Sequence, residues 1–258
     1  MDTLAFLRSV WRLENYRPAF QINLPVDSGT TLRQRFDDPH KLVQHWLQEV
    51  REHQGIEDDY IPILPTYLGT GIFPSAFGCP VRWFENADPW AEPLITTDSA
   101  RVAALGQPAP TDGLLGRVLE LTRTLATSPE PGLAQMFGVG QARRLRVTDV
   151  QGPLDVAYLV WRSQDFMLAL YEHPAAVHAL MQKCTRLVID FIQAQRRLVH
   201  SLGAEFVPCH YPPIWMPDGL GVAVSDDCAA LLSPRQYAEF VLPYLNEVAD
   251  ALGGVFLH

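Results

Sequence analysis

From about residue 60 to its last residue, this chain alternates short apolar segments with longer segments of helical periodicity. The segment Tyr60–Tyr67 is almost continuously apolar, which favours a strand buried on both faces over a strand that faces water. The clearest helix is Pro174–Leu202, where apolar residues recur at helical spacing until Gly203. An alternation of this kind predicts a parallel sheet covered by helices.

The other elements follow in the same order. Further strands are predicted at Val81–Phe84, Arg144–Val150, Ala204–Pro208, Leu220–Val224 and Val255–His258, and further helices at Pro39–His53, Leu114–Thr127, from Pro153 and at Ser233–Leu252. The order fits a doubly wound sheet or a (β/α)8 TIM barrel. Because no G-x-G-x-x-G motif follows a strand, we predict the α/β barrel.

The chain reads as one domain spanning residues 1–258, with an N-terminal helical arm over 1–58 and a barrel that begins near residue 60. The first part of the arm is rich in turn-forming residues, and the proline-rich stretch Glu85–Pro108 predicts an excursion from the barrel. Only about six barrel strands can be counted before His258. We therefore expect a barrel whose last strands are missing from this sequence, which leaves an apolar edge strand.

Charge and cysteine usage narrow the classes of partner. The net charge of −9 gives little electrostatic support for binding nucleic acid or an anionic membrane surface. No segment approaches the ~18 apolar residues of a membrane span. The four cysteines are far apart in sequence, which is typical of reduced thiols. These features predict a cytoplasmic protein with a small-molecule substrate.

Barrel enzymes carry their chemistry at the carboxyl ends of the strands, and that rule selects the candidate site residues. Tyr67, Thr70 and Gln151 are predicted to bind substrate. Asp226 and Asp227 are catalytic candidates, although adjacent residues of an extended segment point opposite ways, so that only one can face a substrate. Tyr211 and Trp215 can stack on a flat ring or form a lid over the barrel mouth.

Three segments resemble the uroporphyrinogen decarboxylase superfamily. LGTGIFPSAFGCPV (68–81) is similar to its loop after the first core strand, and TDVQGPLDVAYLV (148–160) to its glycine-proline turn into a helix. SDDCAALLSPRQYAEFVLPYLNEVADALGGVFLH (225–258) is similar to its S-P-x-x-Y-x-E-F-x-x-P-Y helix and the strand that follows. The likeness covers roughly residues 60–258 and implies a barrel fold.

The methyltransferase branch of that superfamily is the better match. Its members have an acid before the S-P-x-x-Y helix, which implies a catalytic role for Asp226 or Asp227, and an H-x-C motif at the next strand end, which implies that His258 is the first zinc ligand. Zinc lowers the pKa of a bound thiol, which then accepts a methyl group. The resemblance thus implies a zinc-dependent methyltransferase that acts with a corrinoid protein or a thiol acceptor.

Two other functions stay open. Porphyrinogen decarboxylation is the first, and in it Arg33 and Arg35 would bind the carboxylates of the substrate. Against it, the position of the decarboxylases' catalytic aspartate falls on Gly69, and their catalytic tyrosine falls on Leu159, beside Tyr158. The second is a non-catalytic barrel that binds a small molecule.

Overall fold

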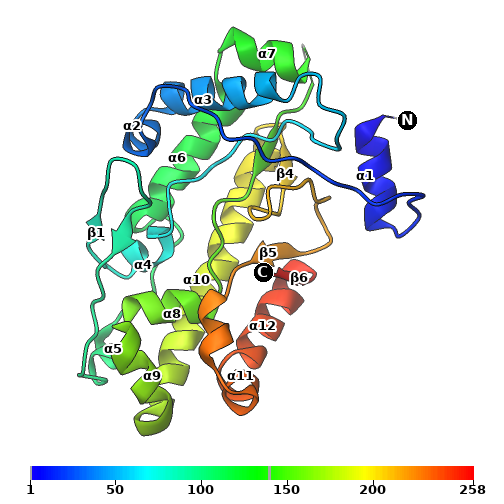
Figure 1. The fold of residues 1–258 in the computed structure, drawn as a ribbon. Helices are drawn as coiled ribbons and strands as arrows, with labels where there is room; N and C mark the ends of the chain where they lie inside the picture. Colours follow the sequence, from blue (N-terminus) through cyan, green and yellow to red (C-terminus); the bar gives the residue numbers. More distant parts are fainter. Residues whose placement is uncertain (1, 139–140) are drawn as a thin grey trace.

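The computed structural model describes residues 2–138 and 141–258, and helices make up most of their regular structure (Figure 1). The helices are α1 (Thr3–Trp11), α2 (Leu32–Asp37), α3 (Pro39–Glu52), α4 (Ile72–Ala76), α5 (Arg101–Ala104), α6 (Gly113–Thr127), α7 (Pro131–Phe137), α8 (Pro153–Val160), α9 (Ser163–Glu172), α10 (Pro174–Ser201), α11 (Pro234–Phe240) and α12 (Leu242–Leu252), with a 3-10 turn η1 (Asp227–Leu231). The strands are β1 (Val81–Arg82), β2 (Trp90–Ala91), β3 (Arg144–Arg146), β4 (Glu205–Val207), β5 (Val222–Val224) and β6 (Val255–Leu257).

The long helix α10 runs through the middle of the molecule and contacts α6, α8, α9 and α12 (Figure 1). Its apolar stripe is fully buried, as the helical spacing of the sequence predicts. On the same helix the buried Gln195 donates to the hydroxyls of Thr66 (2.9 Å) and Thr122 (3.0 Å) and accepts from the backbone N–H of Thr148 (3.2 Å). This amide therefore joins α10 to α6 and to two extended segments.

The extended segments form a parallel series on one side of the helices. β3 pairs with β4, and β5 pairs with β6, both in parallel. The N–H of Ala223 donates to the carbonyl of Pro208 (2.8 Å), which joins the two pairs. Within the described residues no pairing connects β6 back to the segment around Leu64, so the series is not a closed barrel.

The predicted strand Tyr60–Tyr67 is extended but does not form a ladder, because two of its residues are prolines. Pro62 and Pro65 have no N–H to donate. Between them Leu64 makes the one bridge, to Leu145 of β3: its N–H donates to Arg144 (2.8 Å), and its carbonyl accepts from Arg146 (2.9 Å). The expectation of a regular strand was wrong: the segment lies parallel to β3 and is joined to it at Leu64.

The predicted helix Ser233–Leu252 is two helices. Ser233 caps α11 through a capping box with Gln236, and the chain then bends at Val241 before α12. Pro243 lies at the start of α12, where its missing N–H costs nothing, but it cannot continue a preceding helix. Proline thus sets the break that apolar periodicity alone did not predict.

The N-terminal arm contains more helix than its turn-forming residues indicated. α1 packs Leu7 against Ile63, Val207 and Trp215. Beyond α1, Arg17 binds the carboxylate of Asp59 through two hydrogen bonds of 2.8 and 2.6 Å. Across the described residues, none of the helices combines the length and apolar character that crossing a bilayer requires.

Candidate active site

A pocket of about 330 Å³ opens where the parallel segments end. Its wall takes residues from the ends of five successive extended segments. The lining residues are Tyr67, Thr70, Asp149, Gln151, Asp155, His210, Tyr211, Ser225, Asp227 and His258. Six of the eight residues selected from the sequence therefore lie around one pocket, which we call the strand-end pocket.

Asp227 and His258 face each other at the rim of this pocket. Both side chains are exposed, and the imidazole Nδ1 lies 3.7 Å from a carboxylate oxygen. β6 fixes the position of His258, whose N–H donates to the carbonyl of Val224 (2.9 Å). The ring of Tyr211 meets the His258 ring edge-on at 4.7 Å.

Asp226 does not face the pocket but is buried behind it. Its carboxylate accepts from the N–H of Asp155 (3.0 Å) at the start of α8. In return, the carboxylate of Asp155 accepts from the N–H groups of Asp227 (2.9 Å) and Cys228 (3.0 Å). We call this reciprocal arrangement the aspartate clasp. It holds the start of α8 against η1.

The clasp leaves no room for a side chain at residue 152. A Cβ atom on Gly152 would lie 2.3 Å from the carboxyl group of Asp226. Burial, followed by the neighbouring charge of Asp155, raises the pKa of Asp226 to about 8. This pKa favours the neutral carboxyl group at pH 7, and Asp226 is not among the residues that line the pocket, so its predicted catalytic role stays a prediction.

Asp149 is a carboxylate of the pocket lining with a strongly perturbed environment. Burial, followed by the negative charges of Asp88, Asp155 and Asp227, raises its pKa to about 7. No hydrogen bond from the described residues offsets this effect. Asp149 follows β3 at a strand end selected by the sequence, but sequence reasoning did not single it out.

His210 and Tyr67 form one wall of the pocket. Their rings stack at 5.0 Å, and the Tyr67 hydroxyl donates to Asp88 (2.6 Å). Burial lowers the pKa of His210 to about 3, so the ring is neutral. His210 thus contributes a neutral ring to the pocket lining.

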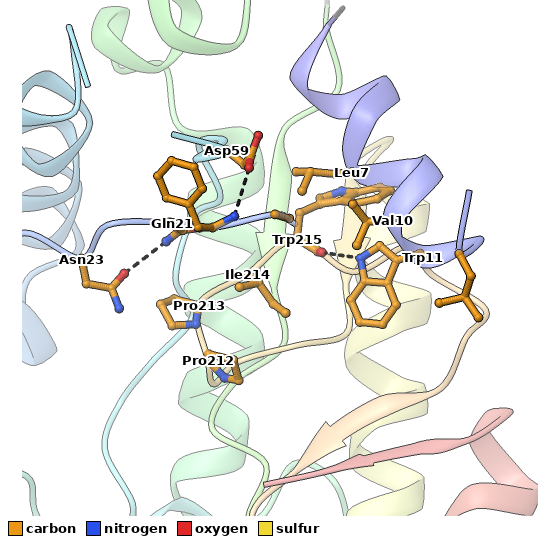
Figure 2. Close-up of a pocket in the computed structure, with 13 residues that line it drawn as sticks. Leu7, Val10, Trp11, Gln21, Asn23, Asp59, Pro212, Pro213, Ile214 and Trp215 are labelled. Carbon is orange, nitrogen blue, oxygen red and sulfur yellow. Dashed lines mark hydrogen bonds between the residues drawn. The ribbon is translucent and has the colours of Figure 1, made fainter. Parts of the chain in front are cut away.

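Trp215 lies elsewhere, in a second cavity of about 490 Å³ that we call the α1 cavity (Figure 2). Leu7, Val10 and Trp11 of α1 form one side of it, and Pro212–Trp215 the other. Trp215 is almost fully buried, and its indole donates to Glu205 (2.7 Å). Its position does not fit the predicted contact with a substrate in the strand-end pocket, because its ring fills the space between α1 and β4.

The described residues do not assemble a metal site. They contain no group of three or more histidine, cysteine, aspartate or glutamate side chains with the geometry to hold a metal ion. All four cysteine thiols are buried. His258 thus has Asp227 beside it and no third ligand from this part of the chain.

Comparisons with known proteins agree with this architecture. A sequence profile described as uroporphyrinogen decarboxylase matches residues 25–204. Uroporphyrinogen decarboxylases of Vibrio cholerae and Aliivibrio fischeri are each 26% identical over 179 residues, which is 69% of this chain and 43% of theirs. The chain thus spans well under half the length of these relatives.

Among solved structures, a methyltransferase from Methanosarcina mazei superposes with a TM-score of 0.65 and 16% sequence identity. The match covers 99% of this chain and 69% of that structure. At this level of identity the likeness concerns the fold alone.

Proposed function

The chain belongs to the uroporphyrinogen decarboxylase family, and on that premise we propose that its strand-end pocket is a methyl-transfer site. The observation that carries this proposal is the charge of the pocket wall. Asp149, Asp155 and Asp227 are among its lining residues, and the lining includes no arginine or lysine. The carboxylate side chains of a porphyrinogen would be repelled there, whereas a small methyl donor would not.

The arginines that decarboxylation would need are engaged elsewhere. Arg33 pairs with Asp37 on α2, and Arg35 contacts the ring of His45 at 2.6 Å. Neither lines the strand-end pocket. Porphyrinogen decarboxylation is therefore the weaker alternative for this chain.

In the proposed reaction a methyl group passes from a donor of the form CH3–X to a thiolate. The C–S bond forms as the C–X bond breaks, and the electron pair of that bond stays on X. Asp227 and His258 lie at the pocket rim, where they can orient the donor and hold a proton for a leaving group that needs one. Asp226 is held in the aspartate clasp and takes no part in this step.

Zinc and a corrinoid protein belong to the proposal as partners of the whole protein. Zinc would lower the pKa of the accepting thiol. The described residues do not fit the metal by themselves, since His258 and Asp227 are two potential ligands and the buried thiols do not join them. We therefore derive no step through zinc, and a corrinoid protein would deliver its methyl group at the exposed pocket rim.

The test is an assay with methylcobalamin as the methyl donor and 2-mercaptoethanol as the thiol, with and without added zinc. The absorbance change that accompanies demethylation of the cobalamin measures turnover. We expect turnover that falls in Asp227→Asn and stays unchanged in Asp250→Asn, an exposed aspartate of α12. A parallel incubation with uroporphyrinogen should give no decarboxylated product. Decarboxylation without methyl transfer would overturn the proposal.

A further inference from the structure

We propose that the α1 cavity binds a neutral apolar ring compound, at a site separate from the strand-end pocket. The two spaces share no lining residue, so this inference does not depend on the proposed function. The volume of the α1 cavity, about 490 Å³, lies in the range of small-molecule sites. All of its lining residues are apolar except Gln21, Asn23 and Asp59.

The first observation concerns the backbone where α1 ends. The N–H of Glu14 donates to the carbonyl of Ser9 (2.9 Å). The N–H of Leu13 donates to the carbonyl of Val10 (3.0 Å), which completes a Schellman motif. Leu13 occupies the left-handed position of this motif, with a φ of 60°. Glycine is usual there because a Cβ atom is strained in that conformation, and in the described part of the chain no other non-glycine residue has a positive φ.

The strained leucine gains no burial in return. Leu13 lines the α1 cavity, yet 91% of its surface is exposed, and Phe20 in the same lining is 53% exposed. Large apolar side chains that gather exposed around a concave space are typical of ligand sites. Strained backbone is likewise typical of segments that hold a ligand. Since Leu13 contributes little to the fold as it stands, we infer that its side chain packs on a ligand.

The charges of the lining select a neutral ligand. Asp59 is the ionisable side chain among the described lining residues, and Arg17 binds both of its carboxylate oxygens. The N–H of Phe20 also donates to this carboxylate (3.0 Å). The indole N–H of Trp11 donates to the carbonyl of Trp215 (2.9 Å). A charged ligand would therefore lose its water without gaining an ionic partner, which is unfavourable.

The walls of the cavity suit a ring compound. The indole of Trp11 and the rings of Pro212 and Pro213 border the space from opposite sides (Figure 2). Flat apolar surfaces of this kind pack well on a flat ligand. Gln21 donates to the side-chain oxygen of Asn23 (3.2 Å), and these two amides form a polar end at which one hydroxyl group of the ligand can bind.

The test is calorimetric titration of the whole chain with 1-naphthol, 1-naphthoate and 1-naphthylmethylammonium, which share one ring system and differ in charge. We expect 1-naphthol to bind and each ion to bind at least about tenfold more weakly. Leu13→Gly and Phe20→Ala should each weaken 1-naphthol binding by about fivefold, because each removes apolar surface from the cavity. Leu168→Ala, at an exposed leucine of α9, should leave this binding unchanged.

Leu13→Gly also separates a binding role from a structural role. Glycine accepts the left-handed conformation, and Leu13 has little packing to lose. The midpoint of urea unfolding should therefore stay the same or rise in this variant while 1-naphthol binding falls. A midpoint that falls would show that Leu13 stabilises the fold, and it would overturn the inference.

Three further results would overturn it. The first is either ion binding as tightly as 1-naphthol. The second is an affinity for 1-naphthol that is absent, or that is unchanged in both Leu13→Gly and Phe20→Ala. The third is self-association in sedimentation that both substitutions abolish, because a second copy of the chain would then occupy the α1 cavity.

Discussion

The strand-end pocket and the α1 cavity differ in the partners that their polar side chains have. The α1 cavity is larger, at about 490 Å³ against 330 Å³, but its carboxylate Asp59 is held by Arg17 and by the N–H of Phe20. In the strand-end pocket, Asp149 and the Oε1 atom of Gln151 have no partner among the described residues. The lining of the strand-end pocket contains no arginine or lysine, so its carboxylates lack the cationic partner that Asp59 has in the α1 cavity.

The largest loss of stability expected from a single substitution lies behind the strand-end pocket. Gly152→Ala should lower the free energy of unfolding by about 3 kcal/mol, because the new methyl group meets the Asp226 carboxyl group and opens the aspartate clasp. Urea denaturation measures it. The matched control is Gly106→Ala, where nothing lies within 4 Å of an added Cβ. Equal stability of the two variants would show that the Asp226 carboxyl group can move away from residue 152 at no cost in stability.

A substitution in the α1 cavity should affect stability without affecting methyl transfer. Trp11→Ala removes packing against the buried cluster of Cys209, Met216 and Ala223 and the hydrogen bond to the Trp215 carbonyl (2.9 Å). We expect a loss of about 2 kcal/mol in urea denaturation, since Trp11 is only partly buried. Methyl transfer from methylcobalamin should change by less than about twofold.

Trp90→Ala, at an exposed tryptophan of β2, controls for loss of the side chain alone. A large loss of methyl transfer in Trp11→Ala would instead make the α1 cavity part of the site.

The aspartate clasp predicts a pH dependence with a definite sign. Asp226 keeps its proton up to about pH 8 in the folded chain, whereas an unfolded aspartate loses it near pH 4. The folded state therefore binds more protons in that window, and stability falls as pH rises, by up to about 1.4 kcal/mol per pH unit, and levels off above pH 8.

Asp226→Asn should flatten this slope, because its amide oxygen can still accept from the N–H of Asp155 and has no proton to lose. Thermal unfolding at pH 5, 6, 7 and 8 compares the two proteins. Parallel pH profiles would mean that Asp226 is charged in the folded state.

The smallest expected effect concerns Trp215. Trp215→Phe removes the indole hydrogen bond to Glu205 and should lower the free energy of unfolding by about 1 kcal/mol. Methyl transfer should be unchanged. A loss of methyl transfer with normal stability would restore the role that the sequence predicted for this residue.

Periodicity predicted the long helices and the order of the strands well. The helix Pro174–Leu202 and the proline start of α8 came directly from the sequence, because burial of one helical face and the geometry of proline are local properties. The missing ladder at Tyr60–Tyr67 and the bend at Val241 came from prolines whose effect depends on neighbouring segments.

The site was predicted in outline. Strand-end position alone brought Tyr67, Gln151 and Asp227 to one pocket. It could not separate Asp226 from Asp227, because which of two adjacent carboxylates faces inward depends on the close approach of Gly152. Trp215 was misplaced for a similar reason. The loop after β4 turns back toward Glu205, which is a tertiary contact that no local pattern encodes.

The aspartate clasp also bears on how this sequence can vary among its relatives. Gly152, Asp155 and Asp226 each occupy space or satisfy donors that the other two define. A change at one of them is tolerated only with a compensating change at another. We therefore expect these three positions to covary among relatives. Asp149 and Gln151 lie outside the clasp and can vary with the ligand.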